Sequence, residues 1–237
     1  MKNITKLFLY LNFCLTLLAC SKISPKGEIE VKDVTVENFT KLNLKGDFKV
    51  FFAKGNQNLV SVETYPNVYK NLDIEVENGI LTIEENRKTD QVDFYNITIF
   101  GKNDLNEVSL SDKVEMNVSG QVKTPEFLLH LKGNSKFMGA VIAPKSKIEM
   151  AEKSNANILG ETKNLNLKLA DSASIMAPYF YVENLEILSK NGASAGLNID
   201  QEMKGTLENT SKLIFYGEPL NKLTRKDIAS VENRKLK

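Results

Sequence analysis

The stretch "LLHLKGNSKF" at residues 128–137 alternates apolar and polar side chains and then closes with a small polar turn. Alternation with a period of two is typical of a β-strand that buries one face. The same arrangement returns four more times along the chain, as "KIEMAEKSNA" (147–156), "LNLKLADSASI" (165–175), "LEILSKNGASA" (185–195) and "GTLENTSKLI" (205–214). This half of the chain is therefore a repeat of strands and turns.

The repeat has a nearly constant length. Ser135, Ser154, Ser174, Ser194 and Ser211 are separated by 19, 20, 20 and 17 residues. A constant period with one strand group and one turn per unit predicts a solenoid, because no unit can bury its apolar face alone. The period of two excludes a helical solenoid, and the leucine spacing does not match that of leucine-rich repeats. We predict an all-β chain with a right-handed parallel β-helix of about six coils over residues 105–217.

The alternation also predicts the two sides of each coil. Side chains that share a phase should fill the inside of the β-helix, and those between them should face water. The inward pairs are Leu129 and Leu131, Ile148 and Met150, Leu167 and Leu169, and Leu185 and Ile187. The outward residues between them are His130, Glu149, Lys168 and Glu186.

A smaller block of strands, residues 34–101, comes before the coils. "FTKLNLKGDFKVFFAKGN" (39–56) predicts two strands around a turn, and "LDIEVENGILTIEEN" (72–86) alternates on both sides of Asn78-Gly79, a strong hairpin signal. "YPNVYKN" (65–71) fits a single helical turn, and "VDFYNITIFG" (92–101) is a further strand. The charged residues 220–237 read as a polar tail, with 225–237 either frayed or a short capping helix.

The N-terminus has the pattern of an export signal. Lys2 and Lys6 precede the apolar run Leu7–Leu18, which is too short to span a bilayer as a helix and fits a secretory signal peptide over residues 1–19. Leu17–Cys20 is similar to the bacterial lipobox, in which the cysteine is acylated and becomes the first residue. The alternatives are an ordinary signal peptide beside an incidental cysteine, or a buried first helix. We expect Cys20 to carry the lipid and the polar residues 20–33 to form a tether.

The amino-acid composition excludes several kinds of partner and chemical site. Of the 237 residues, 42% are hydrophobic and 26% are charged, as in folded globular chains. Residues 1–19 hold two lysines and no acidic residue, so the remainder has 29 basic and 30 acidic side chains and a charge of −1, which argues against a nucleic-acid partner. Cys14 and Cys20 are the only cysteines and His130 the only histidine, so no disulfide framework, thiolate metal site or His-rich metal site is expected in the mature chain. No cofactor motif is present.

The order of these motifs resembles a known family. "FTKLNLKGDFKVFFAKGN", the hairpin around "NGILTIEEN" (78–86), the Leu-x-Leu-x-x-x-Ser repeats and the closing "FYGEP" (215–219) are similar to the putative auto-transporter adhesin, head GIN domain family. The resemblance covers about residues 39–219, within a β domain drawn at 34–219. It implies a β-helical envelope protein of the Bacteroidetes type, in many members a lipoprotein, with a role in adhesion and no catalytic residues. The glycine that the family favours just before the serine is present only at Gly192, with Gly133 two positions before Ser135.

Two further sites are candidates. In "PYFYVEN" (178–184), alternation places Tyr179 and Tyr181 on the outer wall, where they could stack on a sugar or simply cover their neighbours. Ser172 in "DSA" (171–173) resembles an O-glycosylation acceptor of Bacteroidetes. His130 lies between two inward leucines and is expected to be exposed and idle.

We expect a non-enzymatic, lipid-anchored binding or adhesion module of the cell envelope. The outer membrane is its expected location, with the exposed face left open, and a glycan or a cell-surface protein is its expected ligand. One alternative is a structural or sensory lipoprotein facing the periplasm. The other is a β-helical carbohydrate-active enzyme, which needs paired carboxylates. The acidic residues of the coils do not share one phase that would stack them: Glu149, Glu152, Asp171, Glu183, Glu186 and Asp200.

Overall fold

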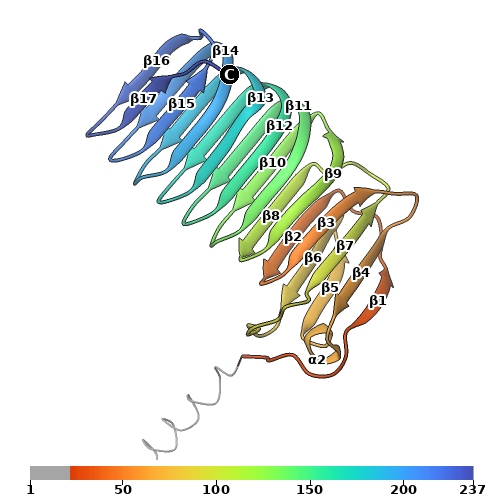
Figure 1. Ribbon diagram of the computed structural model, residues 1–237. Helices are drawn as coiled ribbons and strands as arrows, with labels where there is room; N and C mark the ends of the chain where they lie inside the picture. Colours follow the sequence, from red (N-terminus) through yellow and green to blue (C-terminus); the bar gives the residue numbers. More distant parts are fainter. Residues whose placement is uncertain (1–21, 237) are drawn as a thin grey trace, which may run out of the picture.

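A computed structural model describes residues 22–236 as a single column of stacked β-strands (Figure 1). Strands make up 65% of the chain and helix 2%, and the column is a β-solenoid of about seven turns. The predicted all-β fold and parallel β-helix are confirmed. Within residues 22–236, no helix is long and apolar enough to cross a membrane.

Each coil contributes one strand to each of two sheets, which we call face A and face B. Face A contains β2 (Lys41–Gly46), β6 (Ile80–Glu85), β8 (Glu107–Asp112), β10 (Glu126–Leu131) and β16 (Leu220–Arg225). Face B contains β3 (Lys49–Lys54), β7 (Asn96–Gly101), β9 (Glu115–Lys123), β15 (Lys212–Tyr216) and β17 (Ser230–Asn233). Four long strands turn the corner, first half on face B and second half on face A: β11 (Lys136–Met150), β12 (Asn155–Leu169), β13 (Ser174–Ser189) and β14 (Ser194–Leu207).

The inside of the column is an apolar ladder. All eight side chains predicted to point inward are at most 3% exposed. Leu167, for example, is fully buried between Ile148 and Ile187 of the neighbouring coils. Of the four predicted outward residues, Lys168 and Glu186 are exposed, and His130 and Glu149 are half-buried.

A left-handed turn ends each strand of face A from β8 onward, up to β16. The residue at its centre is Asp112, Glu152, Asp171, Asn191, Asn209 or Asp227, all with φ between 57° and 63°, or Gly133 with φ 73°. Asn and Asp tolerate this conformation better than other residues that have a Cβ. Two residues further on, five of these turns place a fully buried small side chain in the core: Ser135, Ser154, Ala173, Ala193 or Ser211. Val114 takes this position after Asp112, and the partly buried Ala229 takes it after Asp227.

The left-handed turns show that the five serines predicted to mark one phase of the repeat do not all occupy the same position in their coils. Ser174 and Ser194 lie one position later than Ser135, Ser154 and Ser211, and they are half-buried with their hydroxyls hydrogen-bonded to each other at 2.9 Å. Ala173 and Ala193 occupy the inward site in those two coils. The position selects for small size rather than for a hydroxyl group, so alanine replaces serine without loss of packing.

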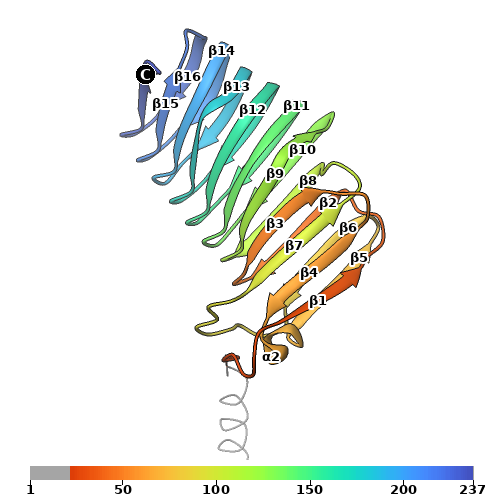
Figure 2. The ribbon, with the colours of Figure 1, turned by 45° about the vertical axis from the view of Figure 1, so that its right-hand side comes forward.

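The N-terminal block is continuous with the solenoid. β2 pairs in parallel with both β6 and β8, and β3 pairs in parallel with both β7 and β9. Residues 41–54 therefore form a coil between two coils that come later in the sequence. Beyond them, β5 (Leu72–Glu77) extends face A and β4 (Leu59–Thr64) and β1 (Glu30–Thr35) extend face B, all antiparallel (Figure 2).

Both expected ends of the chain are more structured than predicted. Residues 220–233, expected as part of a polar tail, add one more coil, in which β16 pairs with β14 and β17 with β15. Leu223, Ala229 and Val231 pack against the core there. In the sequence, the many charged residues around them hide this apolar pattern. In the expected tether, residues 30–33 belong to β1, and residues 22–27 are hydrogen-bonded to the domain. The predicted helical turn is α2 (Pro66–Tyr69).

The close stacking of coils can be tested at Gly205. This residue has φ +124°, and a Cβ atom would lie 1.9 Å from the carbonyl oxygen of Ile187 in the preceding coil. Gly120 has φ +82° and nothing within 4 Å of its Cβ position. Gly120→Ala should lower the free energy of unfolding by about 1–2 kcal/mol from backbone strain alone.

Gly205→Ala adds a backbone collision to the same strain, so we expect it to cost more than about 4 kcal/mol. Urea unfolding of both variants measures the difference. Equal effects would mean that the coils do not approach each other at Gly205 as described.

Candidate functional site

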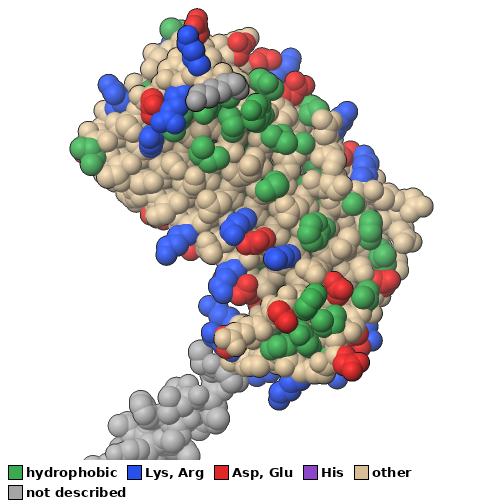
Figure 3. All heavy atoms as spheres, in the orientation of Figure 1, with side chains coloured by type: hydrophobic (Ala, Val, Ile, Leu, Met, Phe, Trp, Pro, Cys, Tyr) green, Lys and Arg blue, Asp and Glu red, His purple; other side chains and the backbone are tan. Residues whose placement is uncertain are grey.

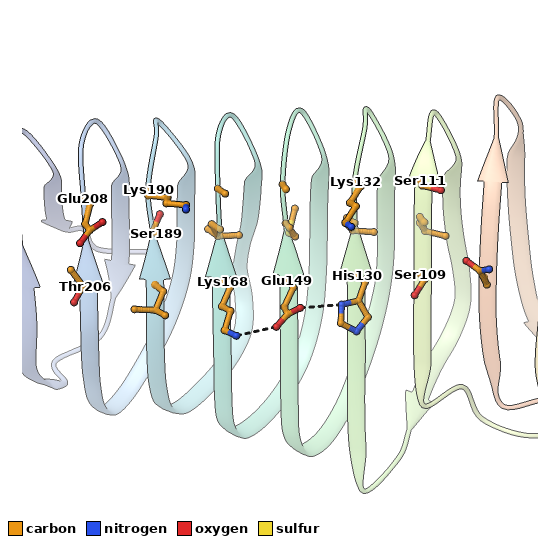
Figure 4. A pocket seen from close by; sticks show the side chains of 18 residues that line it. Ser109, Ser111, His130, Lys132, Glu149, Lys168, Ser189, Lys190, Thr206 and Glu208 are labelled. Atoms are coloured by element: carbon orange, nitrogen blue, oxygen red, sulfur yellow. Dashed lines mark ion pairs between the residues drawn. The ribbon is translucent and has the colours of Figure 1, made fainter. Parts of the chain in front are cut away.

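A groove of about 920 Å³ lies on face A, where the strands of successive coils end (Figure 4). Two outward rows of side chains line it, one residue per coil. The first row is Ser109, His130, Glu149, Lys168, Leu188 and Thr206, joined in register across neighbouring strands. The second row lies two residues further along each strand, at or just past its end: Ser111, Lys132, Ala151, Ala170, Lys190 and Glu208.

The second row forms the floor and two ends of the groove. Ala151 and Ala170 have the smallest side chains in the row, and Lys132 and Lys190 stand on either side of them. Successive strands lie about 4.8 Å apart, so the two lysine Cα atoms are separated by three spacings, or about 14 Å. The groove therefore runs along the axis of the solenoid, with a cation at each end of a shallow alanine floor.

Glu149 lies in the middle of the first row and is already neutralised. Its carboxylate is 3.0 Å from the Lys147 Nζ, 3.2 Å from the Lys168 Nζ and 3.4 Å from the His130 Nδ1. The hydrogen bond from Lys147, followed by that from Lys168, holds the pKa of Glu149 below its ordinary value against the opposing effect of burial.

Lys132 and Lys190 differ from the other cations of the groove. Neither makes an ion pair with any residue between 22 and 236, whereas Lys168 is held by Glu149 and Glu208 is held by Lys226 at 2.7 Å. Both side chains are exposed. Two cations without a carboxylate partner are available to an anionic ligand.

Ser109, His130 and Glu149 stand on three adjacent strands in the order of a nucleophile, a base and an acid (Figure 4). The geometry does not support nucleophilic catalysis. Glu149 accepts contacts from two lysines, and the described residues show no hydrogen bond between Ser109 and His130. The local backbone N–H groups bond to neighbouring strands, for example Lys132 to Leu110 O at 3.0 Å. An oxyanion hole needs such donors to be free.

The tyrosines predicted as a stacking site lie away from the groove. Tyr179 and Tyr181 are 54% and 55% exposed, and Phe180 and Val182 between and beside them are buried, as the alternation predicts. They sit on a bulged part of β13, near the corner where face B passes into face A. Tyr181 lines a separate hollow of about 540 Å³ with Pro144, Lys163 and Asp200.

Ser172 is exposed in the left-handed turn of its coil, two residues after the groove residue Ala170, so a glycan there would stand at the groove's rim. The predicted lipid site Cys20 lies outside the described residues. Within the described part of the chain, no three His, Asp or Glu side chains are grouped to hold a metal ion.

Sequence reasoning missed the groove. Its second row could be found by aligning the repeats on the left-handed turn, because each of its residues directly precedes the turn residue. Alignment on the serines hid this, since Ser174 and Ser194 are out of phase. The face of the molecule seen in Figure 3 gives no single clue, because hydrophobic and charged side chains are mixed on it.

The family model of the putative auto-transporter adhesin, head GIN domain, matches residues 38–219. The chain belongs to this family. The resemblance predicted from the motifs is confirmed, with nearly the same bounds. A comparison with curated proteins finds no match.

Several solved structures superpose on this chain over most of its length. A putative adhesin from Bacteroides fragilis superposes with a TM-score of 0.82 at 15% identity, covering 90% of this chain and 100% of that one. A putative adhesin from Parabacteroides distasonis gives 0.73 at 15% identity, with 90% and 100% covered. A putative lipid binding protein from Parabacteroides distasonis gives 0.72 at 17% identity, with 92% and 100% covered. At such identities the likeness shows a shared fold.

The charge of Glu149 provides a test of the groove's geometry. Lys147→Met should raise the pKa of Glu149 toward its ordinary value, as measured by NMR titration of its side-chain carboxyl carbon. Lys145→Met, at an exposed lysine without an ion pair among the described residues, is the matched control and should leave that pKa unchanged.

The lowered pKa of Glu149 also determines how its contribution to folding stability changes with pH. The contribution of Glu149 is present above its unfolded value near 4.5 and is lost as the pH falls through the lower folded value. Lys147→Met should remove part of this acid sensitivity. An unchanged titration would mean that Lys147 does not bind Glu149 in solution.

Proposed function

We propose that this chain is a lipid-anchored adhesion module of the cell envelope and that the groove on face A is its binding surface. The anchor is proposed from the lipobox-like Leu17–Cys20. The adhesive role is supported by the family and by the neighbours described as putative adhesins. The single observation that carries the binding surface is the pair of unpartnered cations, Lys132 and Lys190, at the ends of the alanine floor.

The groove fits an extended, acidic glycan. It follows the axis of the solenoid, and its two carboxylates, Glu149 and Glu208, are held by lysines, so the charged groups left for a ligand are cations. Protein-binding surfaces depend on buried aromatic or apolar anchors. Leu188, which is 51% exposed, is the one large apolar side chain of the first row. Carboxylates that project every few sugar units would meet Lys132 and Lys190 in turn.

An enzymatic role is not proposed for this site. Backbone N–H groups beside the row of Ser109, His130 and Glu149 are bonded to neighbouring strands, as in Lys132 to Leu110. Contrary to the sequence-based expectation, two pairs of acidic residues do come together on neighbouring coils, but both lie outside the groove: Glu152 with Asp171 at the left-handed turn, and Glu183 with Asp200 in the hollow beside Tyr181. A neighbour described as a putative lipid binding protein shares the fold. The exposed Lys132 and Lys190 on either side of the alanine floor favour an anionic ligand over an uncharged acyl chain.

The glycan specificity is tested with a charge-reversal pair. Lys132→Glu combined with Lys190→Glu should weaken binding of a ten-unit oligogalacturonate at least ten-fold, which corresponds to about 1.4 kcal/mol. Isothermal titration calorimetry at low and physiological salt measures the loss. Lys145→Glu combined with Lys163→Glu changes the net charge equally at the other corner and should bind normally.

The methyl-esterified oligogalacturonate should bind neither form of the protein. Equal weakening by the two lysine pairs would indicate attraction by net charge rather than by the groove. Strong binding of a proteinaceous cell-surface extract, without binding of any acidic glycan, would overturn the glycan assignment.

The location of the module is tested by shaving cells with protease. Peptides from residues 100–220 should be released from intact cells that carry the wild-type chain. Cys20→Ala should move the protein to the soluble fraction, and a chain with Cys14→Ala should behave as wild type. Protection until the cells are permeabilised would instead favour a structural or sensory lipoprotein that faces the periplasm.

A further inference from the structure

The residues after the predicted lipid site are bound to the domain. The Ile23 N–H donates to the Lys88 carbonyl at 2.9 Å, and the Asp90 N–H donates to the Ile23 carbonyl at 2.9 Å. These two bonds make a short parallel bridge with the loop at Thr89, which is 8% exposed. The Lys22 Nζ also lies 3.0 Å from the Asp90 carboxylate. Residues 22–27 are therefore a docked segment rather than a free tether.

Asn67 of α2 clamps the same segment from the other side. Its Oδ1 accepts the Lys26 N–H at 2.8 Å, and its Nδ2 donates to the Ser24 carbonyl at 2.9 Å. Gly27 passes so close to α2 that a Cβ would lie 3.3 Å from the Pro66 Cδ. The segment is therefore held at both of its ends, by the 88–90 loop and by α2.

Very little chain remains between the docked segment and Cys20. Three residue steps separate Cys20 from Ile23, and an extended chain covers at most about 3.6 Å per residue. The Cα of Cys20 is then within about 11 Å of the Cα of Ile23. An acyl group on Cys20 would enter the bilayer close to the 88–90 loop and α2.

This end of the molecule is opposite the C-terminus. In Figures 1 and 2 the first described residues and α2 lie at one end of the column, and the last coil lies at the other. Ten described strands of face A, from β5 to β16, span nine spacings, or roughly 43 Å. Exposed cations near the docked segment suit the phosphates of lipid headgroups: Lys26, Lys70 and Lys88.

We propose that α2 and the 88–90 loop form a surface that rests on the lipid headgroups, and that the docked segment holds the solenoid upright on its anchor. The proposal rests on the lipid anchor of the proposed function. It assigns the bilayer surface as the partner of the N-terminal end. The groove on face A then stands with its axis along the membrane normal, with its later coils, up to Glu208, furthest from the bilayer.

The orientation is tested by energy transfer in vesicles. The acylated full-length protein is purified, its acyl groups are verified by mass spectrometry, and it is incorporated into phosphatidylethanolamine–phosphatidylglycerol vesicles with an acceptor dye on the headgroups. A donor dye is attached to Glu28→Cys in one sample and to Ile228→Cys in another. Ile228 is 77% exposed and lies in the last coil.

We expect transfer from residue 28 to be several times that from residue 228. Six Gly/Ser residues inserted after Ser21 should reduce this difference, because they give the anchor about 13 Å of additional reach and leave the docked segment intact. The same six residues added after Lys237 are the matched control and should change nothing.

The outcomes separate the two proposals. A chain without acyl groups overturns the anchor of the proposed function and this orientation with it. An acylated, vesicle-bound chain with equal transfer from both positions overturns the orientation alone. An insertion after Ser21 that has no effect also overturns the orientation alone, because the docked segment then does not control the angle of the solenoid on the membrane.

Discussion

The structure depends on one constraint: the backbone groups of each short strand find their hydrogen-bond partners on the neighbouring coil. Strands of five or six residues cannot bury an apolar face alone, so coils stack and their inward side chains form continuous ladders. Parallel register then aligns equivalent residues of successive coils about 4.8 Å apart. The small inward side chain after most of the left-handed turns, such as Ser154 or Ala173, allows the chain to reverse without a gap in the core.

The same constraint shapes the candidate site. No coil holds a site by itself, because each contributes one outward residue to each row of the groove. Chemistry on this surface is therefore the chemistry of evenly spaced side chains, which suits a ligand that is itself a repeat. It also determines the state of the backbone around the row of Ser109, His130 and Glu149. In a complete parallel sheet the N–H groups that would stabilise an oxyanion are already hydrogen-bonded.

A solenoid must also protect its two ends, where unpaired strand edges invite association. The antiparallel strands β1, β4 and β5 extend the sheets at the N-terminal end, and the docked residues 22–27 lie against the same end. At the other end, the polar strands β16 and β17 close the column with lysines held in ion pairs, such as Lys222 with Glu202. The two ends thus differ in chemistry, and the bilayer is proposed to meet the N-terminal one.

The sequence alone determined the β-helix, its repeat length, the inward ladder from Leu129 to Ile187 and the family. Those features are local, because alternation and turn residues repeat within each unit. Only the tertiary structure decided that residues 41–54 lie between coils formed later, that Lys132 and Lys190 border one groove, and that residues 22–27 are docked on α2. Each of these depends on pairing between segments far apart in the chain. Local periodicity specifies that a strand forms and which face it buries, but not which other strand satisfies its backbone.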